Sequence, residues 1–108
     1  MKIKYLPKEF VKKGVKYTLL EKNEVFVLYR CESITYGYSY FEVFKPRMGK
    51  PHPMSDEDYD LAELYPSDEL FGTYAWCCSD EASLHKIMRN EFGIDYNVKK
   101  DYKFNVSD

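Results

Sequence analysis

Apolar and polar residues alternate along the first half of the chain in a pattern that predicts β-strands. Over residues 15–22, valine, tyrosine and leucine alternate with lysine and threonine, which is typical of a strand with one side in water. Residues 25–32 begin with five consecutive apolar side chains, which favours a central strand covered on both sides. Residues 36–45 predict a third strand, and Asn23 suits a tight turn before the second. Short connections between the three indicate an antiparallel meander.

A strand at 73–78 is followed directly by a helix at 79–92, and both ends of this helix are marked. Ser79 or Asp80 supplies an N-cap oxygen, and Gly93 offers the left-handed stop. Between them, apolar residues recur at steps of three and four, which gives the helix one apolar side. Because it follows a strand, we expect it to fold back and cover the sheet.

The predicted fold is therefore α+β. A length of 108 residues favours a single domain, residues 1–108. Aromatic residues make up 18% of the chain, mostly tyrosine, which predicts a core built from rings. The helix 79–92 is expected to cover one side of a four-stranded antiparallel sheet. Its strands are 15–22, 25–32, 36–45 and 73–78.

Three segments show weaker patterns. Residues 8–14 suit either a short helical turn or an irregular basic lead-in. Residues 46–71 are interpreted as a long acidic loop, with one helical turn at 58–65 whose leucines point inward. The tail 94–108 either adds an edge strand or trails loosely.

Charge is divided unevenly along the chain. The net charge of −2 argues against a general nucleic-acid binder. Residues 1–50 carry eleven Lys/Arg against five Asp/Glu, whereas residues 51–85 carry nine Asp/Glu and no Lys or Arg. Such a middle segment is either a solvated loop or a docking surface for a basic partner, one that could imitate nucleic-acid phosphates.

The docking hypothesis assigns partner binding to the acids of this segment and to two interleaved tyrosines. We call its seven carboxylates the acidic block. We expect charge to select the partner, while aromatic rings supply the buried contact. The predicted partner-binding residues are Asp56, Glu57, Asp58, Tyr59, Asp60, Glu63, Tyr65, Asp68 and Glu69.

A row of tyrosines gives a possible second surface. Tyr36, Tyr38 and Tyr40 alternate along the predicted third strand and share one side of it. Exposed, the row would form a recognition surface; buried, it would form the core beneath the helix. We prefer the buried interpretation, because large aromatic rings dominate protein cores.

The residues of catalytic type do not form a recognisable motif. Cys77 and Cys78 are adjacent and would point to opposite sides of a strand, and Cys31 is distant, so all three are expected to be reduced and structural. His52 and His85 have no nucleophile placed beside them by a motif, and we interpret His85 as a helix-face partner of residue 81.

A calcium loop is also disfavoured. Asp56, Asp58 and Asp60 have the spacing that opens such a loop, but Leu61 stands where glycine is needed and Ser67 where glutamate is needed. We therefore expect no metal and no cofactor.

The chain also has no sequence feature of a membrane or secreted protein. No apolar run approaches the roughly 20 residues of a membrane span, and the first 13 residues lack the apolar stretch of a signal peptide. The expected location is the cytoplasm.

Two segments carry a resemblance to a group of known proteins. Residues 41–44 read Phe-Glu-Val-Phe, and residues 65–76 read Tyr-Pro-Ser-Asp-Glu-Leu-Phe-Gly-Thr-Tyr-Ala-Trp. This pattern resembles small uncharacterised accessory proteins encoded by phages and prophages. The resemblance implies no catalytic residues and an accessory role, namely binding of a host or defence protein.

The sequence thus predicts a non-enzymatic protein that binds, and inhibits or redirects, a host or defence protein with a basic surface. The alternative is a nucleic-acid-associated protein that uses its basic ends, residues 1–16 and 99–103. An enzyme is the third hypothesis, with His52 as the first residue to mutate.

Overall fold

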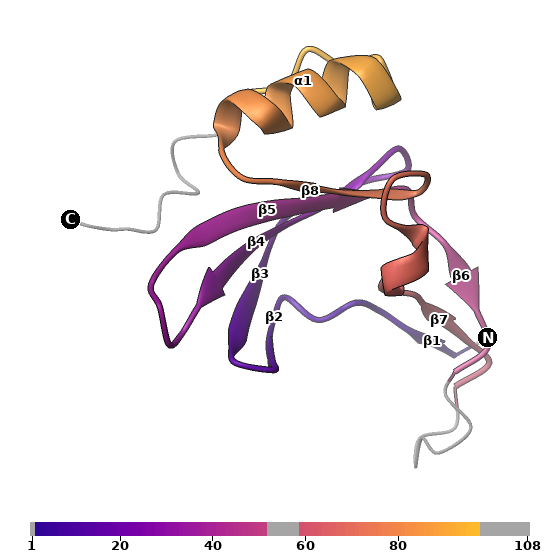
Figure 1. Cartoon of the computed structure of the whole chain (residues 1–108). Helices are drawn as coiled ribbons and strands as arrows, with labels where there is room; N and C mark the ends of the chain where they lie inside the picture. Colours follow the sequence, from indigo (N-terminus) through magenta and orange to yellow (C-terminus); the bar gives the residue numbers. More distant parts are fainter. Residues whose placement is uncertain (1, 52–58, 98–108) are drawn as a thin grey trace.

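The computed structural model describes residues 2–51 and 59–97, which form two sheets and one α-helix (Figure 1). The larger sheet is antiparallel, with the strand order β2-β3-β4-β5-β8. Its strands are β2 Glu9–Lys12, β3 Val15–Lys22, β4 Val27–Ser33, β5 Ser39–Phe44 and β8 Ala75–Cys78. The smaller sheet has the order β1-β7-β6, from Ile3–Lys4, Leu61–Glu63 and Met48–Gly49. The α+β class is confirmed, but the single four-stranded sheet is wrong.

The additional strand of the larger sheet is β2, where the sequence predicted a helical turn or an irregular lead-in. Lys13 and Gly14 have positive φ angles of 51° and 76°, the conformation of a two-residue hairpin turn. This turn pairs β2 with β3, and the Phe10 ring stacks on Tyr17 with centroids 4.5 Å apart. Glycine as the second of two turn residues was the overlooked signal.

The β3–β4 connection is longer than the predicted tight turn. The side-chain oxygen of Asn23 accepts hydrogen bonds from the backbone N–H groups of Val25 and Phe26, at 2.8 and 3.0 Å. These bonds hold residues 23–26 in a loop, so β4 begins at Val27 and Val25 is exposed. Val27, Leu28 and Tyr29, the first half of β4, are buried on both sides, as predicted.

Helix α1, Glu81–Phe92, begins two residues later than predicted and has the predicted caps. The Asp80 carboxylate accepts a hydrogen bond from the Ser83 N–H at 2.8 Å, and Gly93 adopts the left-handed conformation with φ 68°. The helix lies over one side of the larger sheet, which we call the helix face (Figure 1). Leu84 and Met88 are fully buried there. They belong to a cluster with Leu20, Phe26, Leu28, Phe41, Val43, Trp76, Cys78 and Tyr96.

The opposite face of the larger sheet is covered as well, whereas the predicted fold named a cover, the helix, for one side only. Tyr29 is fully buried at its centre, and its hydroxyl donates to the Pro7 carbonyl at 2.5 Å. Besides residues of β3 and β5, the residues packed against this second cluster come from the N-terminal part of the chain and from the predicted long loop, namely Leu6, Phe10, Tyr65 and Phe71. Tyr65 and Phe71 therefore attach the described C-terminal part of the predicted loop to the core.

Within residues 46–71 the structure contains β6, β7 and a 3-10 helix, η1, at Asp68–Leu70. The helical turn predicted at 58–65 is wrong, because residues 61–63 form strand β7, which pairs in parallel with β1. Ile94 and Tyr96 pack against the helix-face core. The remainder of the predicted tail, residues 98–108, lies outside the described residues, so its prediction as an edge strand is untested.

Candidate functional site

The tyrosine row is exposed at one end of the larger sheet, so the interpretation of the row as core is wrong. Tyr36 is 79% exposed and Tyr38 is 56% exposed, while Tyr40 is half-buried. The reason is the position of the turn. Gly37 has a φ of 77° and its N–H donates to the Ser33 carbonyl, so Tyr36 lies in the β4–β5 turn and β5 begins only at Ser39.

The rings of this row are ordered against one another. The Tyr36 and Tyr38 rings are nearly parallel, 9° apart in plane, with centroids 6.3 Å apart. The Tyr38 and Tyr40 centroids are 6.1 Å apart. Ile34, in the same turn, is 61% exposed. We call Ile34, Tyr36 and Tyr38 the tip surface.

A second turn lies beside the tip surface and brings positive charge to it. The Ile34 N–H donates to the Gly14 carbonyl at 2.9 Å, which joins the β4–β5 turn to the β2–β3 turn (Figure 1). Lys12 ends strand β2 and Lys13 lies in the second turn, and both side chains are exposed. An exposed aromatic and aliphatic patch with adjacent ammonium groups can recognise an apolar group flanked by acids.

The described members of the acidic block are partly engaged by the chain's own N-terminal segment. The Asp60 carboxylate accepts from the backbone N–H of Lys2 at 2.6 Å. The Glu63 carboxylate accepts from the Leu6 N–H and from the Lys22 ammonium, both at 2.8 Å. Counter-charge therefore reaches one described member of the block, because the Lys22 ammonium pairs with Glu63, whereas Asp60 is bound by a neutral backbone N–H.

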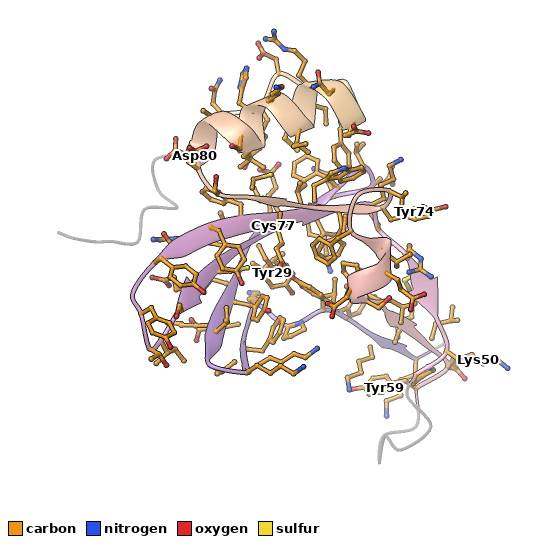
Figure 2. All side chains as sticks on the ribbon, viewed as in Figure 1. Tyr29, Lys50, Tyr59, Tyr74, Cys77 and Asp80 are labelled. Atoms are coloured by element: carbon orange, nitrogen blue, oxygen red, sulfur yellow. The ribbon has the colours of Figure 1, made fainter. Side chains whose placement is uncertain are left out.

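The other predicted partner-binding residues are spread over different environments. Asp56, Glu57 and Asp58 lie outside the described residues. The Tyr59 ring, at the far end of the smaller sheet (Figure 2), has the Lys2 ammonium 5.1 Å from its centroid. Asp68 and Glu69 are exposed on η1. Among the described residues of the acidic block, these two are the ones available to a partner, so the prediction of an acidic partner surface now depends on them.

Tyr65 has a structural position that the sequence did not reveal. Its ring packs on the opposite face against Tyr29 and Phe44, with centroids 5.2 and 4.8 Å away. Its hydroxyl donates to a carboxylate oxygen of Glu42 at 2.5 Å. Because ring and hydroxyl both face the chain itself, Tyr65 holds residues 64–66 onto the sheet.

Glu42 is the acidic residue at the centre of a cluster that sequence reasoning missed. Burial raises the pKa of its carboxyl group, while the hydrogen bond from Tyr65 opposes this rise. Thiols of two neighbouring strands flank it, Cys31 on β4 and Cys77 on β8. The sequence did contain a signal for this position. Glu42 lies on the same side of the predicted third strand as the tyrosine row, where the other residues are aromatic.

The three thiols are protonated at neutral pH. Burial raises the pKa of all three cysteines, that of Cys78 to about 12, and the Glu42 carboxylate raises those of Cys31 and Cys77 further. Because the thiolate is the nucleophile and the metal ligand, raised pKa values disfavour both roles. Cys31 and Cys78 are buried, as expected of structural cysteines, whereas Cys77 is exposed.

His85, on helix α1, contacts the segment that follows the helix. Its Nδ1 lies 2.7 Å from the Tyr96 carbonyl oxygen and its Nε2 lies 3.2 Å from the Asp95 carboxylate. The predicted pairing with residue 81 is not among these contacts, and His85 fastens residues 95–96 onto α1. His52 lies outside the described residues.

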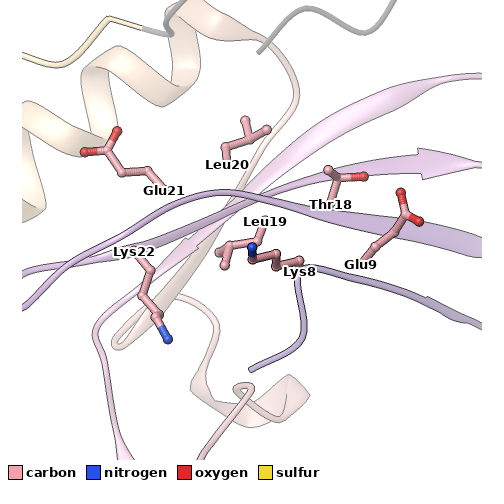
Figure 3. Close-up of a pocket in the computed structure, with 7 residues that line it drawn as sticks. All are labelled: Lys8, Glu9, Thr18, Leu19, Leu20, Glu21 and Lys22. Atoms are coloured by element: carbon pink, nitrogen blue, oxygen red, sulfur yellow. The ribbon is translucent and has the colours of Figure 1, made fainter. Parts of the chain in front are cut away.

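One hollow opens on the larger sheet where β2 leaves β3 (Figure 3). Its lining is mixed in charge and comes from Lys8, Glu9, Thr18, Leu19, Leu20, Glu21 and Lys22. In the part of the chain that the structure describes, no group of three histidine, cysteine or acidic side chains is placed to hold a metal ion. No helix in residues 2–51 and 59–97 has the length and apolar character needed to cross a membrane.

Comparison with known proteins adds no family to these observations. No protein-family model, curated protein or solved structure matches the chain. The resemblance to phage-encoded proteins therefore stays a prediction, and the function is argued from the surface of the molecule.

Proposed function

We propose that this protein acts by binding another protein, and that the tip surface is its docking site. The observation that carries the proposal is the exposure of three large side chains, Ile34, Tyr36 and Tyr38, at a single turn. Large apolar groups exposed together at one place on a protein surface can mark an interaction site.

The geometry of the rings supports a binding role. Tyr36 and Tyr38 already stack on each other, so less side-chain freedom is lost when a partner covers them. Tyrosine combines a large apolar ring with a polar hydroxyl, which is why it is enriched at protein interfaces.

The charge beside the tip surface indicates the chemistry of the partner. Lys12 ends the adjoining strand β2 and Lys13 lies in its turn, so an apolar group surrounded by carboxylates fits this end of the sheet. In a symmetric dimer formed through the tip, these lysines would approach their own copies, which disfavours self-association. We therefore infer an acidic partner, in contrast to the basic partner predicted for the acidic block.

The titratable groups support binding rather than catalysis. The cysteine thiols are protonated, the Glu42 carboxylate is held by Tyr65, and His85 is engaged by Asp95 and Tyr96. The accessory role implied by the resemblance, inhibition or redirection of a host or defence protein, is the form that such binding would take.

The test compares wild-type protein with the double variant Tyr36→Ser/Tyr38→Ser as baits in host lysate. The matched control is Tyr5→Ser, because Tyr5 is also exposed but its ring faces Lys22 at another part of the molecule. A protein captured by wild type is identified, purified and titrated calorimetrically against all three. We expect the double variant to bind at least about tenfold more weakly and the control to bind normally.

Equal binding by the wild type and the double variant would remove the tip surface as the docking site. Light scattering over a range of concentrations provides the second readout. A dimer that forms in wild type and is lost in the double variant would show that the tip binds a second copy instead.

A further inference from the structure

Strand β2 is an edge of the larger sheet, and its hydrogen-bonding register leaves one side open. The Leu19 N–H donates to the Lys8 carbonyl at 2.8 Å, and the two-residue turn pairs Lys12 with Val15. In an antiparallel pair, hydrogen-bonded positions alternate. Residues 8, 10 and 12 therefore bond to β3, whereas Glu9 and Val11 direct their backbone N–H and C=O groups away from the sheet.

These outward groups have the spacing that an added strand requires. Within residues 2–51 and 59–97, β2 has a neighbour only on its β3 side, and no backbone group bonds to the outer side of Glu9 or Val11. Two residues spaced i and i+2 present two donors and two acceptors in line, which is the arrangement used in strand addition. The Val11 side chain is 61% exposed and adds an apolar contact.

The positive charge along this edge disfavours pairing with a basic strand and favours pairing with an acidic one. Lys8, Lys12 and Lys13 are exposed on or beside β2, while the acidic Glu9 is already paired with Lys16 at 3.2 Å. Lysines on an edge strand oppose pairing with a second copy, because lysine would face lysine. The same lysines attract a strand that carries carboxylates.

The hollow of Figure 3 lies at the Lys8–Glu9 end of this edge. It gives a side chain of an added strand somewhere to enter, and Lys8 and Lys22 line it. In strand addition, backbone bonds supply affinity and such side-chain sites supply specificity.

The geometry points to an acidic, extended segment of a partner protein that adds as a strand to the outer edge of β2. This inference rests on the proposed function, because it takes the partner to be a protein, and it adds the mode of binding. The exposed Val11, the two outward backbone pairs and the three lysines form one continuous site for such a segment.

A pair of substitutions at one residue tests the backbone contact. Val11→Pro and Val11→Ala both remove the exposed side chain, but only proline also removes the outward N–H. Proline is tolerated on an edge strand where its nitrogen faces away from the neighbour, so β2 should stay paired with β3. Slow amide exchange at Phe10, whose N–H bonds to β3, reports that pairing in each variant.

The probe is a fluorescein-labelled ten-residue peptide in which aspartate or glutamate alternates with valine. The matched probe replaces each acid with lysine. We expect saturable anisotropy with the acidic probe only, binding about tenfold weaker in Val11→Pro than in Val11→Ala, and slowed amide exchange at Val11 on binding. Lys8→Glu/Lys12→Glu should lose the acidic probe, and this variant decides the matter if proline unpairs β2.

Three results would overturn the inference: no saturable binding of the acidic probe below about 1 mM, equal binding of both probes, or equal affinity of the proline and alanine variants with β2 still paired. The captured partner keeps the two proposals separate. If Tyr36→Ser/Tyr38→Ser loses that partner while Val11→Pro retains it, the tip surface stands and strand addition fails. If both retain it, both proposals fail.

Discussion

At the scale of single residues, Glu42 is a carboxyl group that folding places among aromatic rings. Burial raises its pKa from the ordinary 4.5, so the folded protein holds this proton more tightly than the unfolded chain does. The stability gained from the tighter binding of this proton is therefore fully present below pH 4.5 and is lost as the pH rises through the pKa of Glu42 in the folded protein. At neutral pH the charged group is tolerated because Tyr65 donates to it.

Glu42→Gln should remove this pH dependence. The amide keeps an acceptor for the Tyr65 hydroxyl but carries no charge, so we expect a higher melting temperature than wild type at pH 7 and a smaller difference at pH 4. Thermal unfolding followed by circular dichroism from pH 4 to 8 measures this. Tyr65→Phe is the opposing variant, because it removes the donor and should lower the melting temperature most at pH 7. Parallel profiles for wild type and Glu42→Gln would contradict the assignment.

At the scale of elements, local signals decided which parts of the fold could be predicted. Helix α1 was predictable because its N-cap, its apolar side and Gly93 lie within fifteen residues of one another. Strand β7 was not, since it exists through pairing with β1, some 58 residues away, and three residues show no period. Strand β2 was missed because its turn has lysine at the first position, where asparagine or aspartate is the common signal.

The same distinction applies to the candidate site. The alternation of the tyrosine row was visible in the sequence, but whether the row is exposed depends on where α1 lies and where β5 begins. The helix face is built from Phe41 and Val43, so the tyrosine side of the strand faces away from the helix. Because both sides of this strand carry rings, the sequence pattern alone could not assign the buried one.

The contribution of α1 to the core can be measured at Leu84. Its side chain is fully buried against the sheet, so Leu84→Ala should lower the free energy of unfolding by about 2–5 kcal/mol through lost burial and a residual cavity. Urea denaturation gives this value. The matched control is Lys86→Ala, an exposed position on the same helix, which should change stability by less than about 0.5 kcal/mol. Equal, small effects at both positions would show that α1 does not cover the sheet.

At the scale of the whole molecule, folding brings the basic start of the chain against its acidic middle. The β1–β7 pairing places the Lys2 N–H on Asp60, and Lys22 reaches Glu63 from β3. Segments that appear strongly charged in the sequence are thus partly neutralised by one another. Lys12 and Lys13 stay exposed beside the tip surface, and Asp68 and Glu69 stay exposed on η1. The basic region predicts an acidic partner, and the acidic region predicts a basic partner.

Charge reversal at each region decides between them. Lys12→Glu/Lys13→Glu should weaken binding of the partner captured by wild type. Raised salt should also weaken wild-type binding, because the Debye screening length falls to about 10 Å at 0.1 M ionic strength. Asp68→Lys/Glu69→Lys should leave that binding unchanged. Both variants should melt close to wild type, since exposed charges contribute little to stability. Calorimetric titration at two salt concentrations measures the binding.

The opposite outcome has an equally definite meaning. If Asp68→Lys/Glu69→Lys loses the partner while Lys12→Glu/Lys13→Glu keeps it, the acidic block is the docking surface and the partner is basic. The exposed row of Tyr36 and Tyr38 would then play no part in recognition, and serine at both positions should leave affinity unchanged. The tip surface requires an acidic partner and the acidic block requires a basic one. Titrating the same partner against both charge-reversal variants therefore identifies the docking surface and the charge of the partner together.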